Sequence, residues 1–254
     1  CYAAGLFNCL TSLGHPSFHR LLSVPRERCG LRASAGQRLW LGGADGKWHL
    51  LGIPSAFEMA LTSCRWLYLV GRRRIVVTTS VGTAAPTATL AVAVEQGPPA
   101  RFLVTHGLVA GSNEGDEQAS MEIDGTRVTV RPGPETLAAR HFADPHFVVA
   151  PEQAETIEAV GGAELVGGDA GPTPLLVFRT RPCRRFRLTL TGQARRTDAA
   201  KRPPPSPTLW EQARDILCVR GPDRTLVTRL NACLPWFAHD GLIHFSVPHG
   251  LEQY

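Results

Sequence analysis

Hydrophobic and polar residues alternate along much of the chain up to Gly192, and turn-forming residues separate the alternating runs. Arg38–Leu41 and Lys47–Leu51 flank Asp45–Gly46, a pair typical of a β-hairpin turn. Four more pairs of runs follow: Cys64–Val70 with Arg74–Ser80, Thr87–Glu95 with Arg101–Val109, Ser120–Asp124 with Thr126–Arg131, and Pro174–Thr180 with Arg184–Thr191. Strands that recur with turns between them predict an antiparallel, mainly β sandwich rather than alternating βα units.

The spacing becomes helical in a few places. Glu152, Glu155 and Glu158 suit the polar face of a short surface helix over Pro151–Val160. Beyond the Pro-rich segment Gln193–Pro207, helical spacing covers Thr208–Leu217 and Asp223–Leu234. In the second of these helices Leu226, Leu230, Cys233 and Leu234 share one face. We expect Pro235 to break or kink it and Trp236–Val247 to restart it.

These changes predict three parts: a β-sandwich domain over 1–192, a linker with a helix over 193–221, and the start of a helical domain over 222–254. The first residue is Cys1, and Gly250–Tyr254 directly follows an apolar stretch. We therefore expect the sequence to be an excerpt of a longer protein.

Composition narrows the function classes. The 254 residues carry a net charge of +5, and all basic residues except Lys47 and Lys201 are arginine. Arg72–Arg74 fits a solvated hairpin turn, and the arginines over Arg179–Arg187 fit the outer face of a strand. Because helix-turn-helix, zinc-finger and RNP patterns are missing from the sequence, a nucleic-acid partner is disfavoured.

Cysteine usage and hydropathy exclude further classes. The seven cysteines are odd in number and lack a Cys-x-x-Cys pair, which disfavours a disulfide framework and a zinc ribbon and favours reduced, mostly buried thiols in the cytoplasm. No apolar run approaches the roughly 18 residues that a membrane helix needs.

The histidines and short motifs supply no complete active site. His239, His244 and His249 would lie about 140° apart on a helix, so we expect no metal site from them. His141 and His146 fit a surface loop. Metalloprotease, nucleophile-elbow, phosphate-loop and dinucleotide patterns are missing from the sequence.

The segment Leu217–Tyr254 carries a family resemblance. Pro222-Asp223 precedes an amphipathic helix, Trp236 follows it, and Gly250-Leu-Glu-Gln-Tyr254 ends the segment. This order resembles the junction in the cellobiose and chitobiose phosphorylase family (glycoside hydrolase family 94), including modules of cyclic β-glucan synthases. The resemblance implies an antiparallel β-supersandwich followed by a linker and the first helices of an (α/α)6 barrel.

The same resemblance implies a function for the parent protein. A general acid downstream of Tyr254 would protonate the glycosidic oxygen of a β-glucosidic oligosaccharide while phosphate attacks the anomeric carbon from the opposite face, with inversion. Phosphate would then be a co-substrate, and no other cofactor is implied. Glu252, Gln253 and Tyr254 would bind sugar near the end of the first barrel helix, or form a loop without ligand contact. Trp236 would be a sugar platform or a core residue.

Two alternative functions stay open. Hydrolytic six-hairpin glycosidases share the architecture and use water and a second carboxylate in place of phosphate. A non-catalytic carbohydrate-binding or interaction module also fits a β-sandwich with five tryptophans. A homodimer is compatible with each of these assignments.

Overall fold

The computed structural model describes residues 11–12, 15–18, 37–60, 63–81, 87–108, 119–135, 139, 142–167, 175–196, 217–243, 245–246 and 250–251. Contacts divide the chain into two units, Cys1–Ala200 and Lys201–Tyr254. The first unit holds the strands β1 to β15, and the second holds the helix α3 with two short strands.

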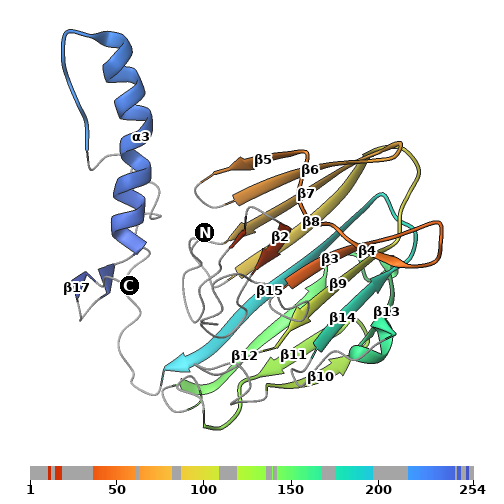
Figure 1. Ribbon diagram of the computed structural model, residues 1–254. Helices are drawn as coiled ribbons and strands as arrows, with labels where there is room; N and C mark the ends of the chain where they lie inside the picture. Colours follow the sequence, from red (N-terminus) through yellow and green to blue (C-terminus); the bar gives the residue numbers. More distant parts are fainter. Residues whose placement is uncertain are drawn as a thin grey trace. The chain divides into compact units, whose positions relative to one another are not determined.

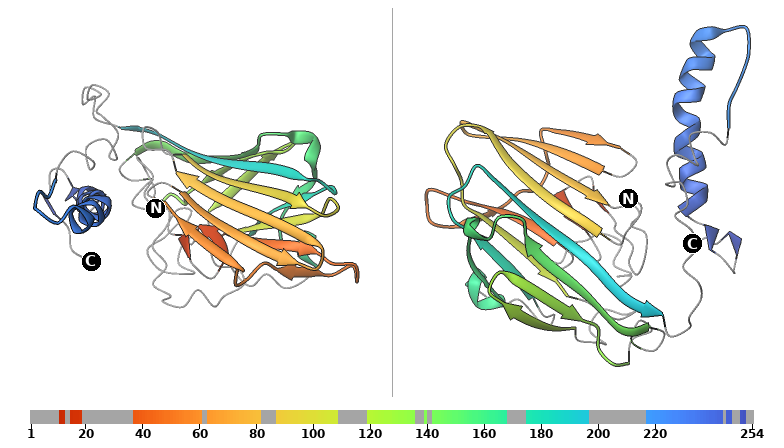
Figure 2. Two further views of the ribbon diagram at one scale, coloured as in Figure 1. Left: turned by 90° about the horizontal axis from the view of Figure 1, so that it is seen from above. Right: turned by 180° about the vertical axis from the view of Figure 1, so that it is seen from behind.

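Two antiparallel sheets form the layers of the first unit (Figures 1 and 2). The larger sheet consists, in order across it, of β10 (Ser120–Asp124), β11 (Arg127–Arg131), β12 (Phe142–Pro151), β15 (Arg185–Arg196), β8 (Thr87–Gln96), β7 (Arg73–Val81), β6 (Ser63–Val70) and β5 (Ala56–Met59). The smaller sheet consists of β13 (Ile157–Gly161), β14 (Leu175–Thr180), β9 (Phe102–Gly107), β3 (Gln37–Gly42) and β4 (Trp48–Leu50). The short strands β1 (Thr11–Ser12) and β2 (His15–Phe18) pair with each other. The predicted antiparallel sandwich is confirmed.

Side chains from both sheets fill the space between the layers. In β8 every second residue from Ala88 to Val94 is buried, as the alternation in the sequence predicts. Phe102 of the smaller sheet packs on Phe186 of the larger sheet, with 5.4 Å between ring centroids. The core therefore joins the two layers directly.

The outer face of the smaller sheet is also covered. Leu103, Leu175 and Val177 form a second buried cluster, and Trp40, Trp48 and residues of the 3-10 turn η2 (Ala163–Val166) pack against it. Burial on both faces explains why every residue of β9 is buried, without alternation.

Two of the five predicted hairpins are crossovers between the sheets. β8 and β9 lie in different sheets, and so do β14 and β15, although all four strands lie close to their predicted ranges. The crossovers contain Pro98-Pro99 and Pro182, and they lie side by side because Ala100 and Cys183 exchange two backbone hydrogen bonds of 3.1 and 2.9 Å. Proline lacks the N–H that a tight hairpin ladder uses. The predicted pairing was therefore wrong.

The predicted helix over Pro151–Val160 is also wrong. β12 continues to Pro151, one 3-10 turn follows (η1, Ala154–Thr156), and Ile157–Gly161 forms β13. The backbone of β13 pairs with β14 instead of bonding within a helix. Glutamates three positions apart suited a helix, but pairing with a neighbouring strand overrides such a local preference.

The expected loop around His146 is part of β12. The strand accommodates Asp144-Pro145 as a bulge, with Asp144 at a φ of 52° and a register shift between Ala143 and His146. The side chain of His146 is only 16% exposed. His141 lies outside the described residues.

In the second unit α3 (Arg224–Ile243) is continuous through Pro235, so of the predicted break or kink the break was wrong. Proline removes one backbone donor, and the remaining bonds of a long helix tolerate that loss. Asp223 Oδ1 accepts from the Leu226 amide at 3.0 Å and so caps the helix. Phe245–Ser246 (β16) pairs with Gly250–Leu251 (β17) where a helix was predicted to continue. The predicted helix Thr208–Leu217 lies outside the described residues except for Leu217.

The chain before α3 is held by one side chain. Asn231 accepts from the Val219 amide at 2.8 Å and donates to the Val219 carbonyl at 3.0 Å. Among the described cysteines, Cys183, Cys218 and Cys233 have free thiols, and Cys218 and Cys233 are exposed rather than buried as predicted. None of the described helices is long and apolar enough to span a membrane.

Candidate functional site

The structure describes one of the four residues predicted to bind substrate. Trp236 lies in α3 with 38% of its surface exposed. Glu252, Gln253 and Tyr254 lie outside the described residues, so their role stays a prediction. His244, His249 and the side chain of His239 also lie outside them. Among the described residues no group of three His, Cys, Asp or Glu side chains is placed to hold a metal ion.

A pocket of about 480 Å³ lies at one end of the sandwich, where the β3–β4 turn, the β6–β7 turn and the two crossovers meet. Its lining includes Lys47, Trp48, Arg72, Arg73, Arg101 and Pro182. We call it the end pocket. Its volume is within the range of sites for small ligands.

Arg101 is held against one wall of the end pocket. Its guanidinium carbon lies 5.7 Å from the centroid of the Trp48 ring, a cation–π distance. Its Nη2 donates to Glu158 Oε2 at 2.7 Å, and Arg179 Nε lies 3.6 Å from the same oxygen. The hydrogen bond from Arg101, with the positive charges of the neighbouring arginines, lowers the pKa of Glu158. Arg101 is therefore oriented by its neighbours without a ligand.

The β3–β4 turn forms part of the rim. Asp45 Oδ1 accepts from the Lys47 amide at 3.0 Å and lies 3.1 Å from His49 Nε2. The contact with His49, followed by the Lys47 amide, lowers the pKa of the Asp45 carboxyl. A Cβ at Gly43 would overlap both Asp45 Oδ1 and His49 Nε2. Glycine at this position allows the turn to close with Lys47 on the rim.

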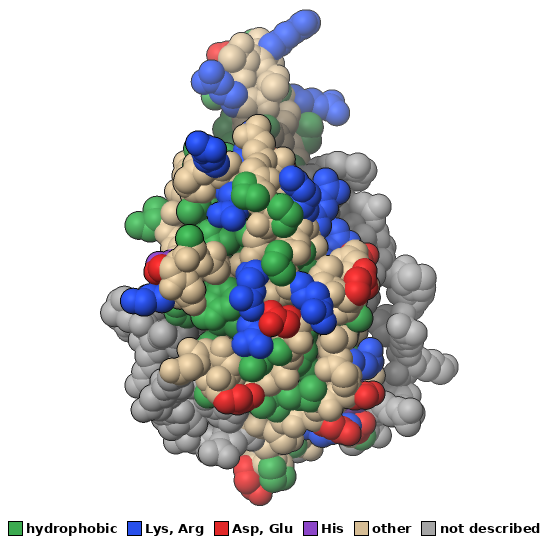
Figure 3. All heavy atoms as spheres, turned by 90° about the vertical axis from the view of Figure 1, so that its right-hand side faces the viewer, with side chains coloured by type: hydrophobic (Ala, Val, Ile, Leu, Met, Phe, Trp, Pro, Cys, Tyr) green, Lys and Arg blue, Asp and Glu red, His purple; other side chains and the backbone are tan. Residues whose placement is uncertain are grey.

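Among the described residues, no Asp or Glu side chain lines the end pocket. Its four charged side chains are Lys47, Arg72, Arg73 and Arg101. Figure 3 looks onto this end of the sandwich, where blue Lys and Arg side chains lie with some red Asp and Glu side chains among them. A concave surface lined by charges of one sign concentrates the field of those charges and attracts anions.

Comparison with known protein families gives a match over most of the sequence. The family model of the glycoside phosphorylase supersandwich domain matches residues 1–192. The chain belongs to this family.

Two individual proteins are also similar to this chain. The chain is 26% identical over 260 residues to 1,2-beta-oligoglucan phosphorylase from Listeria innocua serovar 6a, across 100% of this chain and 23% of that protein. It thus spans about a quarter of the length of this curated relative. A solved structure, a putative kojibiose phosphorylase from human microbiome, aligns with 82% of this chain and 27% of its own at 13% identity and a TM-score of 0.39.

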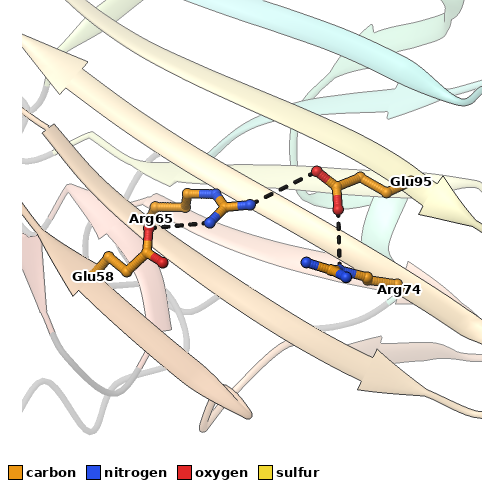
Figure 4. A network of polar contacts seen from close by, with 4 residues as sticks. All are labelled: Glu58, Arg65, Arg74 and Glu95. Carbon is orange, nitrogen blue, oxygen red and sulfur yellow. Dashed lines mark hydrogen bonds and ion pairs between the residues drawn. The ribbon is translucent and has the colours of Figure 1, made fainter.

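The supersandwich domain has a second, shallower hollow of about 300 Å³ on the outer face of its larger sheet. Thr89, Thr189 and Thr191 line it together with Arg187, which pairs with Glu152 at 3.4 Å. Farther across the same sheet Arg65 contacts Glu58 at 3.0 Å and Glu95 at 3.7 Å, and Arg74 contacts Glu95 at 3.0 Å (Figure 4). Both the second hollow and the Arg65–Glu95 network contain acidic and basic side chains, whereas the charged side chains that line the end pocket are all basic.

The end pocket of the supersandwich domain is not apparent from the sequence. Of the predicted solvated turn Arg72–Arg74, only Arg72 lies in the turn, because Arg73 begins β7. The strand that was predicted to start at Lys47 starts at Trp48. Arg101 reaches Trp48 only because β9 lies beside β3 in the smaller sheet. A hairpin between β8 and β9 would have put Arg101 in the other sheet, so the wrong pairing concealed the site.

A buried histidine of the supersandwich domain gives a prediction about pH. His106 in β9 is 1% exposed, with Gln37 Nε2 at 3.4 Å and the edge of Phe178 beside it. Burial lowers the pKa of His106 from 6.5 to about 3. The folded state therefore binds fewer protons than the unfolded state between these values. We expect neutral, buried His106 to leave the free energy of unfolding unaffected above pH 6.5. Below pH 6.5 protonation of the unfolded state should lower that free energy by up to about 1.4 kcal/mol per pH unit.

Urea unfolding at pH 7.5 and pH 5.0 tests this expectation, with His106→Gln beside the wild type. The variant should lose less stability than the wild type between the two values. If both proteins lose the same stability between pH 7.5 and pH 5.0, His106 is not the cause of the pH dependence.

Proposed function

We propose that this chain is part of an inverting glycoside phosphorylase that transfers a glucosyl unit from a β-1,2-linked glucan oligosaccharide to inorganic phosphate. The observation that carries the proposal is the supersandwich family match over residues 1–192, extended by 26% identity to 1,2-beta-oligoglucan phosphorylase along the whole chain. The β-1,2 linkage comes from the activity in the name of that relative.

In this proposal the supersandwich supports a following (α/α)6 barrel, of which α3 is the first helix. The general acid lies beyond Tyr254 and protonates the leaving oxygen, while phosphate attacks the anomeric carbon from the opposite face. The C1–O bond to the leaving sugar breaks as the C1–O bond to phosphate forms, so the product is a sugar 1-phosphate of α configuration. Glu252, Gln253, Tyr254 and the half-exposed Trp236 supply sugar contacts.

We further propose a cytoplasmic location and a homodimer. The described residues Cys183, Cys218 and Cys233 have free thiols, as is usual in a reducing compartment. Light scattering coupled to size-exclusion chromatography tests the homodimer directly.

The activity assay uses the chain together with any sequence that continues it, incubated with short β-1,2-linked glucose oligosaccharides. ³¹P NMR should show a sugar 1-phosphate only when inorganic phosphate is present, and sulfate in its place should give no product. Matched β-1,4-linked oligosaccharides should react far more slowly. Release of reducing sugar at the same rate without phosphate would identify a hydrolase instead. Oligosaccharide binding without any turnover would identify a binding module.

A further inference from the structure

We propose that the end pocket binds a phosphorylated sugar. The requirement for an anion follows from the pocket itself, whereas the choice of a sugar phosphate rests on the proposed function, whose product belongs to that class. The pocket lies wholly within the first unit of the chain, so the proposal needs no second domain.

The charge of the lining favours an anion. Glu158 compensates Arg101, but within the described part of the chain Lys47, Arg72 and Arg73 have no carboxylate within ion-pair distance. Among the described contacts, Arg73 donates its Nε to the Pro98 carbonyl oxygen at 3.2 Å. Two adjacent arginines and a lysine that line one hollow can offer several N–H donors to the acceptor oxygens of a phosphate group.

The geometry argues against a neutral glucan. A glucan chain commonly stacks on a free aromatic face, but the Trp48 ring carries the Arg101 guanidinium. A neutral sugar would also leave the positive charges of Lys47, Arg72 and Arg73 without an opposite charge in the pocket.

Size and the remaining wall favour a sugar attached to the phosphate. About 480 Å³ exceeds what inorganic phosphate fills. Pro99 and Pro182 of the two crossovers are exposed and present an apolar surface beside the cations. A pyranose ring can place its C–H face on such a surface while its phosphate contacts Arg72 and Arg73.

Isothermal titration calorimetry of the full chain with α-glucose 1-phosphate tests the proposal, with inorganic phosphate and glucose as comparison ligands. We expect α-glucose 1-phosphate to bind more tightly than inorganic phosphate, glucose not to bind, and raised salt to weaken binding. The double variant Arg72→Gln/Arg73→Gln should weaken binding by about tenfold or more. The matched control is Arg184→Gln/Arg185→Gln, an exposed arginine pair outside the pocket, which should stay within about twofold of wild type.

Several results would overturn the proposal. Equal weakening in both double variants would mean that general surface charge attracts the ligand. If inorganic phosphate binds as tightly as α-glucose 1-phosphate, the pocket does not recognise the sugar. If glucose binds as tightly as α-glucose 1-phosphate, the pocket does not recognise the phosphate group. No heat at millimolar ligand would remove the site. Because binding is measured without turnover, each outcome is independent of whether the protein performs phosphorolysis.

Discussion

Replacing Trp66 by alanine is expected to lower the free energy of unfolding by about 3–5 kcal/mol. Trp66 is fully buried in β6, between Phe57 of β5 and Val77 of β7, and its ring centroid lies 5.3 Å from that of Phe57. Alanine would leave a cavity in the main core, where both sheets contribute side chains. Urea unfolding followed by circular dichroism measures the loss.

Two variants make this expectation specific. The indole N–H of Trp66 finds no hydrogen-bond partner among the described residues, so Trp66→Phe keeps most of the packing and removes an unsatisfied donor. We expect it to cost less than about 1.5 kcal/mol. Leu69→Ala, three positions along the same strand at 62% exposure, should stay within about 0.5 kcal/mol of wild type. A Trp66→Ala loss no larger than that of Leu69→Ala would contradict the position of Trp66 in the core.

The Gly97→Ala substitution is expected to cost about 2–4 kcal/mol. Gly97 starts the β8–β9 crossover at a φ of +88°, where a side chain is strained. A Cβ there would also lie 2.7 Å from the Arg72 carbonyl oxygen and 3.2 Å from the Arg73 Cα. Backbone strain and overpacking add, because the crossover and the β6–β7 turn would have to separate.

Gly46→Ala is the matched control for Gly97→Ala. Gly46 has a similar φ of +76° in the β3–β4 turn, but a Cβ there meets no atom within 4 Å. It should cost about 1 kcal/mol, the strain alone. Thermal unfolding of the two variants separates strain from contact. Equal losses would mean that the crossover does not pack against the β6–β7 turn as described.

Periodicity predicts the strands well because it reports burial. The alternation in β8 and the continuous burial of β9 reflect one buried face and two buried faces, and each strand lies close to its predicted range. Pairing is harder to predict, because Gly97-Pro98-Pro99 is compatible with either a turn or a passage between sheets. Glu152, Glu155 and Glu158 show the same limit, since their helical spacing yielded to pairing of β13 with β14.

The candidate site depends on that missing information. Lys47, Arg72 and Arg101 lie in three separate segments, and only the sheet order brings them to one hollow. The family resemblance, by contrast, came from Pro222-Asp223, Trp236 and Gly250–Tyr254, a short linear segment that needs no knowledge of pairing. Local motifs were therefore enough to predict a glycoside phosphorylase, whereas the end pocket required the fold.

The synthetic reaction tests the central claim most directly. The chain with any sequence that continues it is supplied with α-glucose 1-phosphate and a β-1,2-linked glucose oligosaccharide as acceptor, and released phosphate and chain length are followed together. An inverting phosphorylase releases one phosphate for each β-linked unit added, and it does not use β-glucose 1-phosphate. If phosphate stays bound to the sugar while the acceptor is shortened by water, the protein is a hydrolase and the account is wrong.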